Sequence, residues 1–257
     1  MIDFRRKLHN LTHPILGRIL MLHRVVEHRN EGDNRELEIT PDFLKQTIET
    51  YRQQGHRFVS IDEACDIIAK GRTDQPFVCL TFDDGYQDNY DIAYPILKQK
   101  QVPFAIYVTT GFIDNRLPMW WYRCESREQC QTCLSNAEVQ QRERSYPGEQ
   151  LGISSESLKA LDADPLCTIG AHTVSHPKLD ILSLNDQQKE ITQSRQELEA
   201  LLDHPILHFS YPHGAYNSDT LAIISRQPFH SSLCAWGGTL RRGANPLTLP
   251  RIELRQP

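Results

Sequence analysis

Two adjacent carboxylates, Asp83 and Asp84, follow a short apolar run in the stretch CLTFDDGYQDNY (79–90). If this run is a buried strand, it delivers both side chains to one edge of a sheet, where two like charges repel and raise each other's pKa. A bound cation would offset that repulsion. We therefore expect one carboxylate to bind a metal ion, while the other acts as a base on a water molecule that the metal acidifies. For an Asp-Asp-Gly sequence alone, a solvated turn is the alternative.

Two histidines four residues apart, His172 and His176, lie in the stretch GAHTVSHPKL (170–179). Gly170 and Pro177 favour a loop or a single turn after a strand, and such a turn can bring both imidazoles to one point. Two imidazoles and one carboxylate are a common ligand set for a catalytic zinc ion that keeps positions open for water and substrate. A hydrogen-bonded structural role is the alternative for this pair alone.

Apolar runs alternate with segments of helical periodicity along most of the chain. Strands are expected at 19–26, 58–61, 77–82, 103–110, 166–173, 207–212, 230–236 and 247–254, and helices at 41–55, 62–71, 89–101, 183–203 and 218–226. This alternation predicts parallel strands joined by helices, and about seven such units in one α/β domain favour a barrel over an open sheet. We expect a single domain over 1–257 with an irregular insertion at about 113–155.

The expected strands end on polar residues of the types that bind metals. His23 follows the first strand, Asp83 and Asp84 follow the third, and His172 follows the strand after the irregular region. Functional groups of a (β/α) barrel lie where strands end and loops begin. These side chains are therefore expected to form one site.

Composition limits the partners and the compartment. The 257 residues carry a formal net charge of −5, so no nucleic acid is expected as a partner. The seven cysteines form no recognisable disulfide framework, which favours a reducing compartment. Pro14 and Arg18 interrupt the apolar N-terminal stretch, and no other run reaches the roughly 18 apolar residues of a membrane span. We expect a cytoplasmic protein with no transmembrane segment.

Three motifs in a fixed order make the chain resemble a known family. The motifs TFDDGY (81–86), HTVSHP (172–177) and FSYPHG (209–214) resemble those of the polysaccharide deacetylases of the NodB-homology type, carbohydrate esterase family 4. The resemblance covers about residues 77–216 and implies a distorted (β/α)7 barrel that removes acetyl groups from N-acetylated sugars or polysaccharide. The implied cofactor is a divalent metal, foremost Zn²⁺ with Co²⁺ or Ni²⁺ as alternatives, and the implied partner is an acetylated sugar or glycan.

The resemblance also implies roles for single residues. Asp83 would be the general base, and the metal ligands would be Asp84, His172 and His176. A backbone N–H near Tyr211 would stabilise the oxyanion alongside the metal. Residues expected to bind substrate are Tyr86, Tyr211, Pro212, His213 and Arg251.

The sequence departs from the family's pattern at two places. The third motif lacks the arginine that orients the base, and Arg251 in LPRIEL is the candidate substitute, with a rim arginine as the alternative. The C-terminal stretch also lacks the family's general-acid histidine, whereas the first apolar run, ILMLHRVV (19–26), ends on His23. This order resembles the circularly permuted subgroup that acts on poly-N-acetylglucosamine. His23 is therefore the expected general acid, with His213 as its rival.

The expected insertion contains two further candidates for function. Trp120 and Trp121 could stack on sugar faces or anchor the insertion to the barrel. Cys124, Cys130 and Cys133 could belong to a structural zinc site, although a fourth ligand is not evident.

Three other classes of protein compete with the deacetylase interpretation. A glycosidase needs two carboxylates about 5–9.5 Å apart on either side of the scissile bond, which adjacent aspartates do not suit. A non-catalytic carbohydrate-binding barrel and a metal-dependent amidohydrolase acting on a non-sugar amide both stay open.

Overall fold

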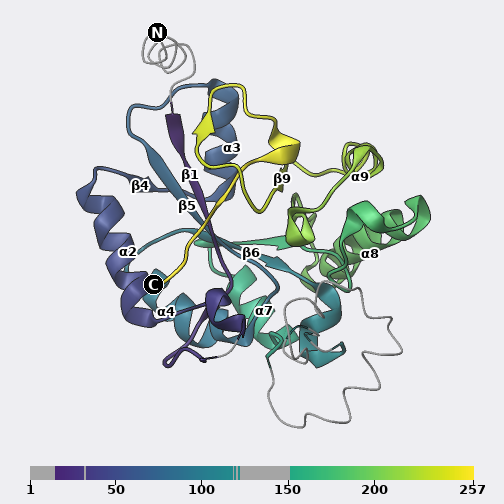
Figure 1. Cartoon of the computed structure of the whole chain (residues 1–257), viewed down its shortest axis with the longest axis horizontal. Coiled ribbons are helices and arrows are strands. Elements are labelled where there is room, and N and C mark those ends of the chain that lie inside the picture. Colours follow the sequence, from purple (N-terminus) through teal and green to yellow (C-terminus); the bar gives the residue numbers. More distant parts are fainter. Residues whose placement is uncertain (1–14, 32, 118, 120, 122–150) are drawn as a thin grey trace.

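A curled, mainly parallel sheet forms the centre of the computed structural model, which describes residues 15–31, 33–117, 119, 121 and 151–257 (Figure 1). Its strands are ordered β10-β1-β5-β6-β7-β8-β9, and every pair from β1 to β9 along this order is parallel. The strands of the sheet are β1 (Ile15–Leu22), β4 (Arg57–Phe58), β5 (Phe77–Phe82), β6 (Phe104–Val108), β7 (Cys167–Ala171), β8 (His208–Ser210), β9 (Ser231–Leu233), β10 (Leu240–Arg241) and β11 (Ile252–Glu253). A separate pair is formed by β2 (Arg24–Val25) and β3 (Glu38–Ile39).

Helices lie around the outside of this sheet (Figure 1). They are α2 (Pro41–Gln53), α3 (Ile61–Lys70), α4 (Tyr94–Gln99), α7 (Ser155–Asp162), α8 (Leu184–Leu202) and α9 (Ser218–Ile224). Their ends follow the expected signals: the hydroxyl of Thr40 accepts a hydrogen bond from the backbone of Phe43 at the start of α2, and Gly71 ends α3 with a left-handed φ of 66°.

The C-terminal segment closes the barrel between the last and the first parallel strands. Leu249 exchanges backbone hydrogen bonds of 2.9 Å with Ser232 and Cys234 beside β9. Three residues later, β11 pairs in parallel with β1, with Ile252 opposite Leu20. The expected distorted (β/α) barrel is therefore confirmed, and the first and last strands of the chain are neighbours, as a circular permutation of a barrel requires.

Several expected elements differ from the observed ones. The strand expected at 19–26 is divided between β1 and β2, and the strand expected at 247–254 is limited to β11, because Pro246–Thr248 form a 3-10 turn. The strand expected at 58–61 is limited to β4, because Ser60 instead caps α3. The helix expected at 89–101 is divided into a π-helical turn (Asn89–Ala93) and α4. Pro95 lies in the first turn of α4, directly after the π-helical turn, and because it has no N–H it interrupts the regular α-helical hydrogen-bond pattern there.

Alternate residues of the strands face two apolar layers. Val78, Leu80 and Phe82 of β5 belong to a large cluster that includes residues of α4, α7 and α8. Phe77 and Cys79 belong to a second cluster with residues of α3. Because both faces of β5 are buried, this strand is apolar except at Thr81, and its C-terminal end places the two aspartates at the sheet edge.

Part of the expected insertion lies outside the described residues, namely 118, 120 and 122–150. These include Trp120, Cys124, Cys130 and Cys133. Among the residues that the structure describes, none of the helices combines the length and apolar character that crossing a bilayer requires.

Candidate active site and metal centre

Asp83 and Asp84 are both buried at the C-terminal end of β5, with 3% and 2% of their surfaces exposed. The chain turns directly after the strand, because Asp84 and Gly85 have left-handed φ values of 74° and 80°. A Cβ atom at Gly85 would lie 3.0 Å from the Val108 side chain, and this close approach together with the left-handed φ favours glycine at the turn. The turn separates the two carboxylates and gives them different neighbours.

Asp84 lies against the two histidines of the second motif. Its Oδ1 atom is 3.4 Å from Nε2 of His172 and 3.3 Å from Nε2 of His176. His172 follows β7, and His176 is brought back toward it by a turn in which Thr173 and His176 have left-handed φ values of 65° and 60°. The three side chains are buried, and one ligand atom from each lies within 4.8 Å of the others.

The donor atoms of this cluster suit a divalent metal ion. The ring of His172 donates Nδ1–H to the carbonyl of Ser210 at 2.8 Å, which leaves Nε2 as the lone-pair atom that faces Asp84. Asp84 Oδ1 is buried, and it accepts no hydrogen bond of normal geometry from the described residues. An ionised oxygen left in this way is costly unless a cation neutralises it. Two imidazoles and one carboxylate are a ligand set that binds zinc.

Asp83 instead forms a buried ion pair with Arg251. The guanidinium donates to both carboxylate oxygens, at 2.7 Å to Oδ1 and 2.6 Å to Oδ2. It also donates to Thr81, Ser210 and the carbonyl of Cys234, so that all five N–H groups of the arginine have acceptors. Arg251 is only 1% exposed and uses all its N–H groups within the protein, which suits the expected substitute for the motif arginine that orients Asp83 better than contact with a substrate.

The charges of the site shift the pKa values of its members in opposite directions. Burial raises the pKa of Asp83, but the charges of Arg251 and His172 outweigh burial and lower it to about 2. Burial lowers the pKa of His172, but Asp83 and Asp84 outweigh it and raise that pKa. His176 has its pKa lowered well below the usual value by burial and by its histidine neighbours. Asp83 is therefore an anion at neutral pH.

Two histidines outside the ligand set lie near this cluster. Leu22 of β1 lies opposite Phe82 of the parallel strand β5. His23 and Asp83 are the next residues of these two strands, so they are at the same end of the sheet. His23 is half-buried, and its carbonyl accepts a hydrogen bond of 2.8 Å from the Asn89 side chain. The ring of His213 lies 4.6 Å from that of His176, measured between centroids.

Several aromatic residues expected at the substrate are instead buried in the protein. Tyr86 is fully buried, and its hydroxyl accepts a hydrogen bond of 2.8 Å from Nε1 of Trp121. Trp121 is 7% exposed and packs its ring 4.8 Å from that of His176. Tyr211 is fully buried and donates its hydroxyl to the carbonyl of Leu247. The expected sugar contact by Trp121 and the acetyl contacts by the Tyr86 and Tyr211 side chains are not supported.

The backbone N–H expected to stabilise an oxyanion near Tyr211 is not that of Tyr211 itself or of Pro212. The N–H of Tyr211 donates to the carbonyl of Leu233 at 3.0 Å, within the β8–β9 ladder, and is therefore not directed at an oxyanion. Pro212 is buried and has no N–H to offer.

Ser210 and Trp236 are two residues of this region that the sequence interpretation did not single out. Ser210 contacts Asp83 and Arg251 through its hydroxyl and His172 through its carbonyl. Its position directly before Tyr211 in the third motif was the available signal. Trp236 is 66% exposed, and a Cβ atom added at Gly214, the last residue of the third motif, would lie 3.4 Å from its ring.

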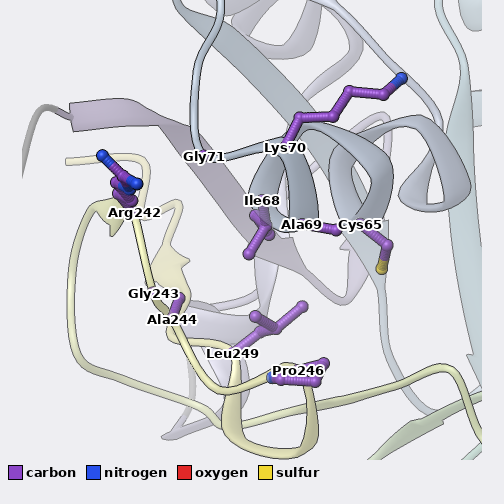
Figure 2. A pocket seen from close by; sticks show the side chains of 10 residues that line it. All are labelled: Cys65, Ile68, Ala69, Lys70, Gly71, Arg242, Gly243, Ala244, Pro246 and Leu249. Atoms are coloured by element: carbon purple, nitrogen blue, oxygen red, sulfur yellow. The ribbon is translucent and has the colours of Figure 1, made fainter.

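A separate pocket lies away from the motif residues. It has a volume of about 340 Å³ and lies between the end of α3 and the loop at 242–249 (Figure 2). Cys65, Ile68 and Leu249 line its interior, and the side chain of Arg242 lies against Gly71 at the helix end. Because neighbouring Leu240 pairs with Gly17 near the start of β1, this pocket is at the opposite end of that strand from His23.

Comparison with known proteins agrees with the geometry. Residues 70–231 match the polysaccharide deacetylase family. The chain belongs to the polysaccharide deacetylase family. The chain is 27% identical over 177 residues to the "Putative polysaccharide deacetylase YxkH" of Bacillus subtilis (strain 168), which covers 69% of this chain and 51% of that protein. It is 22% identical over 200 residues to the poly-β-1,6-N-acetyl-D-glucosamine N-deacetylase of Staphylococcus aureus (strain MRSA252), which covers 76% of this chain and 60% of that protein. The matched part of the chain thus spans between about half and three fifths of the length of these curated relatives.

Solved structures show the same fold. The deacetylase PplD of Streptococcus pyogenes, in complex with acetate, superposes with a TM-score of 0.73 at 25% identity, over 94% of this chain and 93% of that one. IcaB from Ammonifex degensii also gives a TM-score of 0.73, at 22% identity and over 93% and 92% of the two chains.

Proposed function

We propose that this member of the family is a metal-dependent deacetylase that hydrolyses acetyl groups from N-acetylated sugars or glycans. The observation that carries the proposal is the buried cluster of Asp84, His172 and His176 beside an ionised Asp83, at the C-terminal edge of the barrel sheet. This edge is where barrel enzymes have their active sites.

Asp84, His172 and His176 would hold the metal, with Zn²⁺ as the expected ion and Co²⁺ or Ni²⁺ as alternatives. When bound, such an ion lowers the pKa of water to about 7 and polarises a carbonyl oxygen. The hydrogen bond from His172 Nδ1 to Ser210 keeps the ring oriented with its other nitrogen toward the site.

Asp83 is the proposed general base. It would take a proton from the water whose oxygen attacks the acetyl carbon, while Arg251 keeps the carboxylate in a fixed orientation. A pKa of about 2 makes Asp83 a weak base, so proton transfer to it requires a strongly acidified water. Its main contributions would be orientation and negative charge next to the attacking oxygen.

His23 is the proposed general acid, which protonates the leaving nitrogen as the carbon–nitrogen bond breaks. The products are then acetate and the free amine. His213 fits this role less well, because burial and the nearby charge of Lys178 lower its pKa to about 4. A histidine with this pKa is unprotonated at neutral pH and has no proton to donate.

Trp236 is the proposed contact for a sugar ring. Its exposed ring near Gly214 of the third motif is flat and apolar, which suits the apolar face of a pyranose. The name of the S. aureus relative specifies a β-1,6-linked polymer of N-acetylglucosamine, and we propose a glycan of this class as the first substrate to test.

Acetate release from N-acetylglucosamine oligomers with β-1,6 and β-1,4 linkages tests the proposal. We expect a chelator to abolish release, added zinc or cobalt to restore it, and Asp84→Ala to stay inactive after metal addition. Full activity of Asp84→Ala would contradict the metal site. Glycan binding without turnover in metal-loaded protein would favour a binding barrel, and turnover restricted to non-sugar amides would favour an amidohydrolase.

A further inference from the structure

Glu190 of α8 accepts three hydrogen bonds from the loop that joins the two metal-binding histidines. Its Oε2 atom accepts from the backbone N–H groups of Val174 and Ser175, at 2.8 and 3.0 Å. Its Oε1 atom accepts from the hydroxyl of Ser175 at 2.7 Å. A single half-buried carboxylate on the neighbouring helix thus satisfies every polar hydrogen of Ser175 and the backbone N–H of Val174.

This loop has an unfavourable backbone conformation that needs such support. Thr173 and His176 both have left-handed φ values, 65° and 60°. For residues other than glycine, each such conformation costs on the order of 1 kcal/mol or more. Without this backbone conformation, the His176 side chain would not turn back toward Asp84. Its Nε2 atom lies 3.3 Å from Oδ1 of Asp84.

Three other contacts hold the loop, two of them from the barrel and one within the loop itself. The backbone N–H groups of Thr110 and Gly111 donate to the carbonyls of Thr173 and Val174, and the hydroxyl of Thr173 accepts from the N–H of His176. These contacts engage the loop's carbonyls and its own turn. Glu190 is the side chain that receives the two N–H groups between the turns.

We propose that Glu190 is a positioning residue for the metal site, which fixes His176 in its metal-binding orientation by hydrogen bonds to the loop. This inference rests on the proposed function, because it concerns the same metal site. Glu190 is too far along the chain from the three motifs for their spacing to indicate it, and its own carboxylate is engaged by the loop rather than by the ligand cluster.

Substitutions of Glu190 separate hydrogen bonding from charge. Glu190→Ala removes all three acceptor contacts. Glu190→Gln can keep all of them, because its carbonyl oxygen can accept both N–H groups while its NH₂ donates to the Ser175 hydroxyl. Glu199→Ala is the matched control, since Glu199 lies on the same helix and accepts from Arg195 and from the backbone of Ile206, away from the loop.

Zinc affinity, measured by competition with a chromophoric chelator, is the main readout. We expect Glu190→Ala to bind zinc about 10- to 100-fold more weakly, the range for loss of an outer hydrogen-bond partner of a ligand. The zinc affinities of Glu190→Gln and Glu199→Ala should stay within about threefold of that of the unmodified chain. This difference is smaller than the loss expected for Glu190→Ala. Unchanged affinity in Glu190→Ala, equal weakening in Glu199→Ala, or a Gln variant as weak as the Ala variant would each overturn the inference.

Hydrogen exchange of the metal-free protein gives a second readout that does not need zinc. Glu190→Ala should speed exchange of the Val174 and Ser175 amides relative to the Glu199→Ala variant, and unchanged exchange would overturn the inference. An unmodified chain that binds no zinc would contradict the proposed metal site, whereas the exchange result would still decide whether Glu190 orders the loop.

Discussion

Arg251 donates one hydrogen bond to each carboxylate oxygen of Asp83, although the two residues are 168 positions apart in the chain. The pair is buried and is formed where the closing segment of the barrel passes beside the end of β5. The arginine that the third motif lacks is therefore replaced in space by one from the C-terminal segment.

Replacing Arg251 by Gln should reduce both stability and activity. A buried carboxylate that loses its partner costs about 3–5 kcal/mol of unfolding free energy, and a displaced catalytic group costs about 100-fold in kcat/KM. Urea unfolding and acetate release measure the two effects. The double variant Asp83→Asn/Arg251→Gln should lose less stability than the sum of the two single variants. Additive losses would contradict a coupled pair.

Asp83→Asn and Asp84→Asn should separate catalysis from metal binding. Of the two aspartates, Asp84 is the one with an oxygen within 3.5 Å of both ligand histidines, so its Asn variant should lose zinc. Asp83→Asn should keep zinc and lose about 100-fold or more in turnover, as expected for loss of a general base. Zinc content by mass spectrometry, measured beside acetate release, checks both. If the two variants lose zinc equally, the proposed division of roles is wrong.

The two candidate acids can be separated by the leaving group of the substrate. His23→Gln should lower kcat for an N-acetyl amide by about 100-fold or more. The same variant should hydrolyse 4-nitrophenyl acetate at nearly the original rate, because this leaving group needs no proton. His213→Gln serves as the comparison and should not show this selectivity. The opposite pattern would assign the acid role to His213.

The depressed pKa of Asp83 predicts how stability depends on pH. Because the pKa falls from about 4 in the unfolded chain to about 2 in the folded one, ionised Asp83 stabilises the fold fully above pH 5. This stabilisation is lost as the pH falls toward 2. In a His172→Gln background, which removes the histidine whose pKa Asp83 raises, the difference in unfolding free energy between the chain and Asp83→Asn should be constant from pH 8 to 5, with chelator present. It should shrink by about 1 kcal/mol by pH 3. A change that begins near pH 6 would contradict the lowered pKa.

Trp236→Ala should weaken glycan binding with little effect on chemistry. Loss of a stacking surface removes about 1 kcal/mol, so KM for an oligomer should rise several-fold while kcat stays nearly constant. Trp236→Phe should recover part of the loss, because it keeps an aromatic face. An unchanged KM in Trp236→Ala would remove this residue from the proposed sugar site.

The sequence by itself determined the fold class and the residue types of the site. Apolar runs ending on Asp83, Asp84 and His172 predict parallel strands with a site at their C-terminal ends, because strand and helix periodicities are local properties of the chain. The spacing of His172 and His176 likewise predicts two imidazoles at one point. The fold and the cluster of Asp84 with the two histidines agree with these predictions.

Tertiary structure alone decided which neighbours these residues have. Closure of the barrel places Arg251 behind Asp83, where its N–H groups are used within the protein, so that it orients the base instead of contacting substrate. Packing buries Tyr86 and Tyr211, which the motifs would have placed at the substrate, and leaves Trp236 exposed near Gly214 of the third motif. Glu190 reaches the histidine loop only because α8 packs beside it. Contacts of this kind depend on how distant segments meet, which local sequence patterns do not specify.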